Sequence, residues 1–301
     1  MSWRQLVIEL GELDADHIEG LLFDAGALAV TLTDARDDPV LEPLPGETPL
    51  WANTCLTALF KAEADVARIA DDLSRTLDGD ASPAWRIESL EDRQWEREWL
   101  RDFRPMRFGK RLWVSPVDAV VDAADAVVIR LDPGLAFGTG THPTTALCLE
   151  QLERMLSAES ASEKRVLDFG CGSGILAIGS VLLGAADADA VDIDPQAIVA
   201  TERNAAQNGV ANRVRAALIE SGDRAGTHAA EYDVVVANIL ARPLVDLAEQ
   251  LTQSLADNGQ LVLSGLLAPQ ANSVAAAYGN EVRFADPFVR DGWACLVGQR
   301  T

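Results

Sequence analysis

From Val166 to Gly174 the chain reads Val-Leu-Asp-Phe-Gly-Cys-Gly-Ser-Gly, and the apolar run Ile-Leu-Ala-Ile follows at 175–178. An aliphatic stretch that ends in Asp168 and continues into alternating glycines predicts a buried strand, a tight turn and a helix. Glycines let the backbone turn sharply and approach a ligand closely, because they carry no Cβ. We therefore expect this stretch to form the first turn of a nucleotide-binding α/β unit.

The spacing of the glycines indicates which nucleotide this turn binds. A dinucleotide-binding turn has the pattern G-x-G-x-x-G, whereas this chain has D-x-G-x-G-x-G, beginning at Asp168 with Gly170 and Gly172. That pattern resembles the first motif of Rossmann-like S-adenosylmethionine methyltransferases. The next predicted strand, 188–191, is followed by Asp192, about 20 residues after the turn, where a carboxylate can accept hydrogen bonds from both ribose hydroxyls.

The second half of the chain alternates predicted helices and strands, which indicates a parallel sheet with helices on both faces. The last two strands have no helix between them, which requires an antiparallel pair. A seven-stranded sheet with one reversed strand resembles the methyltransferase arrangement, and a Rossmann dehydrogenase usually lacks it. The expected helices are 144–156, 174–183, 195–208, 243–256 and 269–277, and the expected strands are 165–169, 188–191, 214–219, 233–237, 260–264, 282–285 and 293–298.

The first 90 residues predict a different kind of domain. Their strand-helix-strand-strand-helix-strand order is that of a ferredoxin-like α+β sandwich. They carry no glycine-rich loop, and acidic side chains outnumber basic ones about three to one. We therefore interpret residues 1–90 as a substrate-recognition domain. The expected strands are 3–10, 28–33, 54–60 and 85–89, the expected helices are 14–25 and 63–77, and an acidic, proline-rich loop is expected at 34–49.

Between the two domains, residues 91–104 predict a linker helix. Trp95 and Trp99 lie four residues apart and so on one face of that helix, where we expect them to pack between the domains. Strands at 107–115 and 127–131 then lead into the second domain, which we place at 105–301.

Composition limits the possible partners. The 301 residues carry 47 Asp and Glu against 25 Lys and Arg, a net charge of −22. Such a chain repels phosphate backbones, so we expect no direct nucleic-acid binding. The acidic balance suits a basic partner, or it serves only to keep the protein in solution.

The cysteines, the histidines and the N-terminus each exclude a class of protein. The four cysteines and three histidines are scattered, which fits neither a disulfide framework nor a metal site. The N-terminus does not resemble a signal peptide, and no stretch approaches the roughly 18 apolar residues of a membrane span. We expect a monomeric, cytoplasmic protein that binds no metal.

Two polar segments of the second domain are further candidates for ligand contacts. The glycine- and threonine-rich loop 131–145 opens onto a helix, with Pro143 as its first residue and Thr144 and Thr145 able to satisfy free N–H groups. This loop is either a capped connection or a clamp for a ligand carboxylate. Asn238 follows an aliphatic strand, and its carbonyl can accept from an amine while leaving the nitrogen lone pair free to attack. The simpler explanation is an asparagine that ends a strand.

Two aspartates of the cofactor region have different expected roles. Asp168 either orients the glycine turn or holds a cofactor ammonium group. Asp194 immediately precedes Pro195, so we expect it to cap the helix that begins there, and we exclude it from the site.

Taken together, the loop 131–145, the turn 168–178, the segment Val-Asp-Ile-Asp-Pro-Gln-Ala at 191–197 and the segment Val-Val-Ala-Asn-Ile-Leu at 235–240 resemble the ribosomal protein L11 methyltransferase family. The segments Trp-Glu-Arg-Glu-Trp at 95–99 and Arg-Phe-Gly-Lys-Arg-Leu-Trp at 107–113 resemble it as well. The resemblance covers most of residues 91–301. The first domain matches the family only in the order of its strands and helices and in its architecture.

The resemblance implies an enzyme that trimethylates amines of ribosomal protein L11, with lysine side chains as the main acceptors, and uses S-adenosylmethionine as cofactor. It implies that an N-terminal ferredoxin-like domain grips the substrate protein. The cofactor contacts that it implies are Thr145, Gly170, Asp192 and Asn238. From their own chemistry we add Asp168 and Gly172 to the expected cofactor contacts, and we expect Asn238 also to position the amine. The proline-rich loop 34–49 is longer than the resemblance leads us to expect.

Three other functions are compatible with parts of the sequence. A methyltransferase of RNA or of a small molecule conflicts with the net charge or with the separate N-terminal domain. An NAD-dependent dehydrogenase would use the glycines and Asp192, but it leaves Asn238 and the reversed strand unexplained. A non-enzymatic binder would have no use for an intact set of cofactor motifs.

Overall fold

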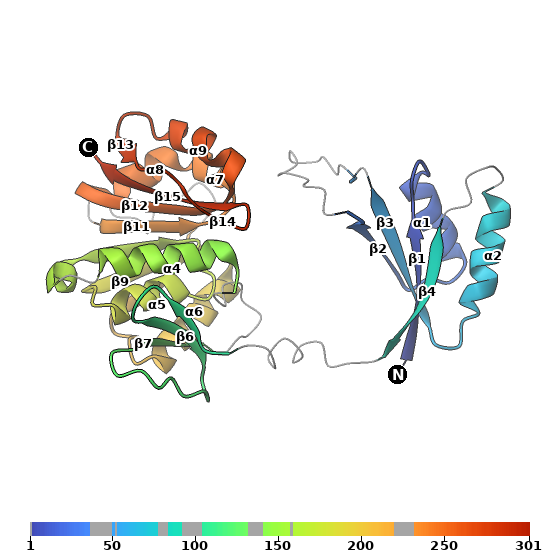
Figure 1. Cartoon of the computed structure of the whole chain (residues 1–301), viewed down its shortest axis with the longest axis horizontal. Coiled ribbons are helices and arrows are strands. Elements are labelled where there is room, and N and C mark those ends of the chain that lie inside the picture. Colours follow the sequence, from blue (N-terminus) through green and yellow to red (C-terminus); the bar gives the residue numbers. More distant parts are fainter. Residues whose placement is uncertain are drawn as a thin grey trace. The chain divides into compact units, whose positions relative to one another are not determined.

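The computed structural model describes residues 2–36, 50–51, 53–77, 84–91, 104–131, 141–156, 159–219 and 232–301. The chain divides into two compact units, residues 1–98 and 99–301 (Figure 1). Three predicted segments lie wholly or mostly outside the described residues: the proline-rich loop, the linker helix with its two tryptophans, and the central part of the threonine-rich loop. The boundaries at 90 and 104 therefore stay predictions.

The described residues of the first unit form a four-stranded antiparallel sheet with two helices, and the strand order is β2-β3-β1-β4. Both helices and the sheet contribute to one apolar cluster, in which Ile18 and Leu73 from the helices meet Leu6, Leu56 and Phe60 from the strands. This arrangement confirms the ferredoxin-like prediction. The elements are β1 (Ser2–Glu9), α1 (Ala15–Asp24), β2 (Ala29–Asp34), β3 (Thr54–Lys61), α2 (Val66–Thr76) and β4 (Trp85–Glu91).

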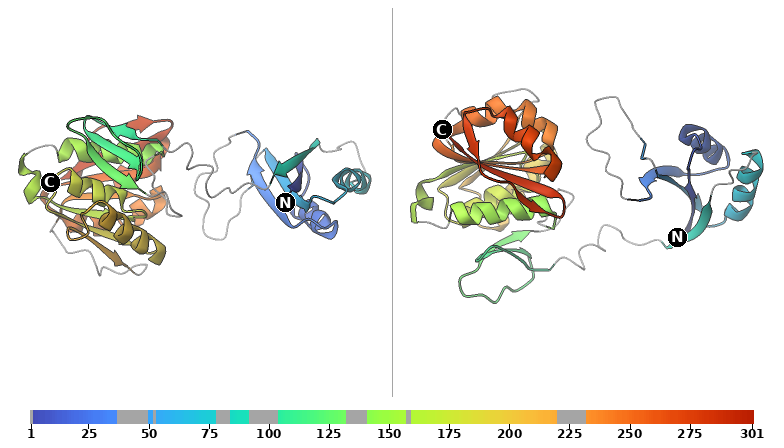
Figure 2. Two further views of the ribbon diagram at one scale, coloured as in Figure 1. Left: turned by 90° about the horizontal axis from the view of Figure 1, so that it is seen from below. Right: turned by 45° about the horizontal axis from the view of Figure 1, so that its top comes forward.

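The second unit is built on a sheet of strand order β10-β9-β8-β11-β12-β15-β13, with helices on both faces (Figure 2). All seven predicted strands are present, and β15 runs antiparallel to both β12 and β13, as predicted. A short eighth strand, β14, pairs with β15 and was not predicted. The strands are β8 (Arg165–Phe169), β9 (Asp187–Asp192), β10 (Val214–Leu218), β11 (Tyr232–Asn238), β12 (Leu255–Leu267), β13 (Val282–Phe284), β14 (Phe288–Arg290) and β15 (Trp293–Arg300).

The helices of this unit occupy the predicted regions with one difference. The expected helix 243–256 begins two residues earlier, because proline is tolerated in the first turn of a helix, and it is divided at Leu247 into two short helices. The helices are α4 (Pro143–Met155), α5 (Ile175–Leu182), α6 (Pro195–Gln207), α7 (Ala241–Asp246), α8 (Ala248–Ser254) and α9 (Ala271–Ala277), with 3₁₀ turns at Glu159–Glu163 and Ala268–Gln270.

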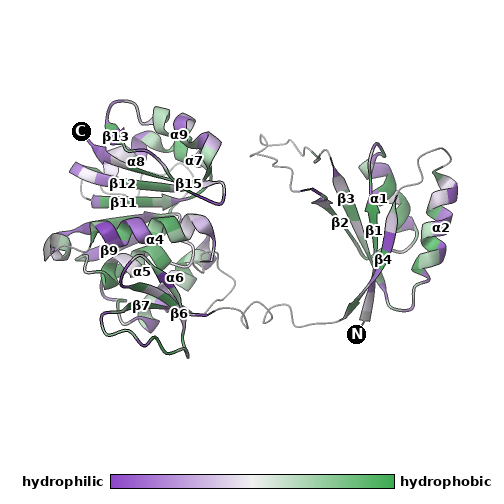
Figure 3. Cartoon of the chain, viewed as in Figure 1, coloured by the Kyte–Doolittle hydropathy of each residue, from purple (hydrophilic) through white to green (hydrophobic). Residues whose placement is uncertain are grey.

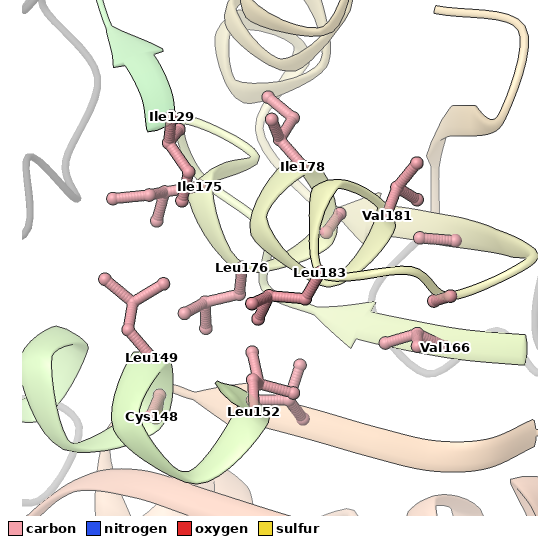
Figure 4. Close-up of a cluster of buried hydrophobic side chains, with 14 of the residues drawn as sticks. Ile129, Cys148, Leu149, Leu152, Val166, Ile175, Leu176, Ile178, Val181 and Leu183 are labelled. Atoms are coloured by element: carbon pink, nitrogen blue, oxygen red, sulfur yellow. The ribbon is translucent and has the colours of Figure 1, made fainter. Parts of the chain in front are cut away.

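Strand β11 shows how the sequence builds the two faces of the core. Val234 and Val236 belong to one apolar cluster, whereas Val235 and Ala237 belong to the other. Side chains of a strand alternate between faces, so a strand covered on both sides is apolar throughout. Figure 3 shows this hydrophobic character along the central strands, and Figure 4 shows the cluster that α4 and α5 form on one face.

The expected strand 107–115 is instead a hairpin. β5 (Met106–Phe108) turns at Gly109, which has φ +72°, into β6 (Leu112–Pro116), and β7 (Val127–Leu131) pairs parallel with β6. The turn is held by the carboxylate of Glu153 on α4, which accepts backbone N–H groups of Lys110 at 2.6 Å, of Leu112 at 3.0 Å and of Arg111. The second half of the motif 107–113 is thus tied to α4 by one buried carboxylate.

We predict that Glu153→Gln lowers the free energy of unfolding by about 1.5–3 kcal/mol, the usual contribution of charged hydrogen bonds. The amide directs an N–H₂ group at backbone donors that need an acceptor. Chemical denaturation of the two proteins measures the difference, with Glu202→Gln on the exposed side of α6 as the control. Equal unfolding midpoints for wild type and Glu153→Gln would contradict this role.

Candidate functional site

The predicted site residues lie at the carboxyl edge of the second unit's sheet. β8 has β9 on one side and β11 on the other, so the strand order reverses between β8 and β11. Open α/β sheets bind ligands beyond the strand ends at such a reversal. Asp168 is the penultimate residue of β8 and Gly170 directly follows that strand, whereas Asp192 and Asn238 are the last residues of β9 and β11, which brings the predicted residues to one edge.

The glycine turn after β8 is folded against the end of β9. The backbone N–H groups of Gly170 and Cys171 donate to the carbonyl of Val191 at 2.8 and 3.1 Å. Gly170 has φ +76°, and a Cβ there would collide with the side chain of Ile239, the residue after Asn238. Glycine is therefore required at position 170 for both conformation and space.

Two polar side chains of α6 donate hydrogen bonds to carbonyl groups of the same turn. The Thr201 hydroxyl donates to the Gly172 carbonyl at 3.2 Å, and the Asn204 amide donates to the Ser173 carbonyl at 2.8 Å. Both side chains are buried. Thr201 and Asn204 were not predicted as site residues. Polar residues three apart on the buried face of a predicted helix are nevertheless a usable signal, because buried polar groups require partners.

Asp168 is the most unusual group of the site. It is fully buried, and its Oδ2 accepts from the Ala177 N–H at 3.0 Å, whereas its Oδ1 has no partner among the described residues. Burial raises the pKa of Asp168 to about 7, and the negative charge of Asp192 adds to this effect. A cation placed beside Oδ1 would satisfy the oxygen and favour the charged carboxylate.

Asp192 both shapes the turn and remains able to bind a ligand. Its Oδ2 accepts from the Gly172 N–H at 2.9 Å, and its Oδ1 accepts from the Asp194 N–H at 3.0 Å. A carboxylate has about four acceptor positions, so both oxygens can also accept from ligand hydroxyls. Asp194 accepts from the Gln196 N–H at 2.8 Å and so caps α6, as predicted.

Asn238 is oriented by the first turn of α4. Its Nδ2 donates to the Thr145 hydroxyl at 3.2 Å, which leaves Oδ1 as the oxygen that can accept from a ligand. Thr145 is fully buried, so within the described part of the chain it acts on the site through Asn238.

The cap of α4 differs from the expectation. His142 occupies the N-cap position, where its Nδ1 accepts from the Thr144 N–H at 3.4 Å. The threonines were the predicted caps, but Thr144 Oγ1 instead lies 2.7 Å from His142 Nδ1. Pro143 is the first helical residue, as predicted.

Gly265 of β12 was not identified from the sequence. It has φ +88°, and a Cβ there would collide with the carbonyl group of Ile239. Ile239 thus fits between Gly170 and Gly265, and the ends of β8, β11 and β12 meet at this residue.

The described residues contain neither a metal-binding cluster nor a membrane-spanning helix. Within the described ranges, no group of three or more His, Cys, Asp or Glu side chains is arranged to hold a metal ion. No helix that the structure describes is long and apolar enough to cross a membrane. All four cysteines are buried and free.

Comparison with known proteins identifies the family. The family model for ribosomal protein L11 methyltransferase matches residues 2–301. Proteins named ribosomal protein L11 methyltransferase from Methylococcus capsulatus and Pasteurella multocida are each 48% identical to this chain over 299 residues. Each match covers 99% of this chain and 99% of the relative. A solved ribosomal protein L11 methylase from Lactobacillus delbrueckii subsp. bulgaricus is 34% identical with a TM-score of 0.58, and the match covers 66% of this chain and 100% of that one.

The fold and the cofactor motifs agree with these matches, which confirm the resemblance inferred from the sequence. The chain therefore belongs to the ribosomal protein L11 methyltransferase family, whose members are S-adenosylmethionine-dependent methyltransferases.

Proposed function

We propose that this protein transfers methyl groups from S-adenosylmethionine to lysine side-chain amines of ribosomal protein L11, with the N-terminal amine of that protein as a further acceptor. The observation that carries the proposal is the Thr145–Asn238 hydrogen bond of 3.2 Å, which orients an amide oxygen at the end of β11 beside the glycine turn. The names of the relatives support the choice of substrate.

The residues at the strand ends suit the cofactor. The ammonium of its methionine part would meet Oδ1 of Asp168, which is buried and has no partner among the described residues. At Gly170 and Gly172 the protein backbone would approach the cofactor closely, and Asp192 would accept hydrogen bonds from the ribose hydroxyls. When bound, the cofactor supplies an activated methyl group on a positively charged sulfur.

Asn238 would position the acceptor amine. A lysine amine has an ordinary pKa of about 10.4, so it must lose a proton before it can attack. Burial and a nearby positive charge both lower that pKa, and water can then take the proton. Asn238 accepts from a remaining N–H through Oδ1 and leaves the lone pair directed at the methyl group. We assign no side chain as general base.

The N-terminal unit would recognise the substrate protein. Its exposed acidic side chains include Glu12, Asp16 and Asp72. A protein that binds ribosomal RNA requires basic surface, which such side chains attract. We further propose that the enzyme works as a monomer in the cytoplasm and makes no direct contact with nucleic acid.

We predict that the protein binds S-adenosylmethionine and not NAD, and that Asp192→Ala weakens the binding by about 1–3 kcal/mol through loss of charge-assisted hydrogen bonds. Isothermal calorimetry measures both quantities. Asp194→Ala is the matched control, because it removes a neighbouring carboxylate that caps α6. Equal affinities for wild type and Asp192→Ala would remove Asp192 from the site.

We predict that Asn238→Ala lowers the turnover number while the fold and the cofactor affinity are kept, because the amine loses its alignment in the transition state. Thr145→Val should lower it less, since it removes only the hydroxyl that orients the amide. Single-turnover methylation of L11 at saturating cofactor measures the rates. Wild-type rates in Asn238→Ala would make this residue a simple strand end, and parallel losses of affinity in both variants would assign it to cofactor binding alone.

We predict that a chain shortened to residues 91–301 binds the cofactor normally but methylates intact L11 poorly, because the recognition surface is gone. Calorimetry and a methylation assay on the same preparation separate the two effects. If the shortened chain kept full activity on intact L11, the N-terminal unit would have another role.

A further inference from the structure

The hairpin of β14 and β15 brings a tryptophan to the site edge of the sheet. Its turn residues Asp291 and Gly292 both have positive φ, +50° and +79°, which is the two-residue type I′ turn that suits a tight hairpin. Trp293 follows this turn directly and pairs with Arg290 across the hairpin and with Leu267 of β12. None of the residues that the mechanism uses lies on this hairpin.

The register of the sheet relates Trp293 to Asn238. Asn238 is paired with Ser264 of β12, and the Ser264 hydroxyl donates to the carbonyl of Ala294, the residue after Trp293, at 2.8 Å. Trp293 therefore lies at the carboxyl edge, two strands from Asn238. The cofactor residues Asp168 and Asp192 lie on the other side of Asn238, on β8 and β9.

Contacts with α4 also relate Trp293 to Asn238. The indole ring of Trp293 meets the imidazole ring of His142 edge to face, with ring centroids 4.7 Å apart and planes at 71°. His142 caps α4 three residues before Thr145, whose hydroxyl accepts from Asn238. Both rings are half-buried, so each keeps some exposed surface.

The hairpin is fixed to α4 by further contacts. Nη2 of Arg290 lies 3.0 Å from both carboxylate oxygens of Glu150, and the Arg154 guanidinium lies 5.2 Å from the centre of the Phe288 ring. These contacts hold the hairpin, and with it Trp293, against the helix that orients Asn238.

We infer that Trp293, backed by His142, lines the acceptor side of the site and binds the aliphatic stem and the partly methylated ammonium group of the target side chain. The inference rests on the proposed function. An indole offers a large apolar surface, and its ring attracts ammonium ions strongly. A lysine that has received one or two methyl groups is protonated again in water, so a contact of this kind retains it for the next transfer.

The state of His142 is compatible with a bound cation. Burial lowers the pKa of His142 below its ordinary value, which favours the neutral ring, and a neutral ring does not repel an ammonium group.

The test uses the full-length protein with Trp293→Leu and Trp293→Phe. The control is Trp113→Leu, which removes a half-buried indole from β6, outside the site. We expect Trp293→Leu to lower kcat/KM for L11 about tenfold, the scale of one desolvated cation–π contact. Mass spectrometry should show mono- and dimethylated products accumulating, while calorimetry shows an unchanged cofactor Kd. Trp293→Phe should fall between wild type and Trp293→Leu, and Trp113→Leu should behave as wild type.

Two results would overturn the inference while wild type methylates L11 normally. One is a wild-type rate and product distribution in Trp293→Leu. The other is a loss of cofactor affinity that parallels the loss of rate, which would place Trp293 at the cofactor. If Trp293→Leu fails the thermal-unfolding check, Trp293→Phe decides by the same criteria. Failure of wild type itself to methylate L11 would instead overturn the proposed function.

Discussion

The close packing of Ile239 between two glycines is the constraint on which the site depends. Its side chain takes the space where a Cβ of Gly170 would lie, and its carbonyl group takes the space where a Cβ of Gly265 would lie. Tight packing of this kind transmits displacement, because protein interiors have little free volume. The turn that would bind the cofactor and the asparagine that would position the amine are therefore set relative to each other by one residue. Methyl transfer needs such a fixed relation, since a misplacement of about 1 Å can cost a hundredfold in rate.

The buried carboxylate of Asp168 makes the stability of the ligand-free protein depend on pH. Its folded-state pKa of about 7 lies above its ordinary value of 3.8, so the folded state holds the proton more tightly than the unfolded state. The contribution of Asp168 to the free energy of unfolding therefore falls as the pH rises from the ordinary pKa of 3.8 to the folded-state pKa of about 7. A cation beside Oδ1 would favour the ionised form. Binding of a positively charged ligand and stability of the turn are thus coupled through one residue.

The sequence predicted the topology well because its signals there are local. Aliphatic runs identify the strands, and the absence of a helix before β15 requires its reversal. Candidate site residues could be named from the sequence where they lie at the end of a strand: Asp192 and Asn238 are the last residues of β9 and β11, and Asp168 is the penultimate residue of β8. Their roles stay predictions. Gly265 and Thr201 were missed because their roles depend on contacts with segments far along the chain, at Ile239 and Gly172. The hairpin at Gly109 was missed for a similar reason, since the Glu153 carboxylate that holds its turn lies more than 40 residues later.

Strand β9 shows why composition alone cannot separate structural carboxylates from functional ones. Asp189 lies three residues before Asp192, yet it accepts from Arg215 at 2.6 Å, Tyr232 at 2.7 Å and Arg165 at 3.3 Å. This network lies toward the amino ends of the parallel strands, away from the glycine turn. Its ion pairs are partly exposed and contribute little individually, but Asp189 is buried and its carboxylate oxygens need these hydrogen-bond donors. Asp192, at the carboxyl end of the strand, accepts from backbone N–H groups, which leave acceptor positions open. One aspartate of β9 therefore stabilises the sheet, whereas another aspartate of the same strand remains available for binding.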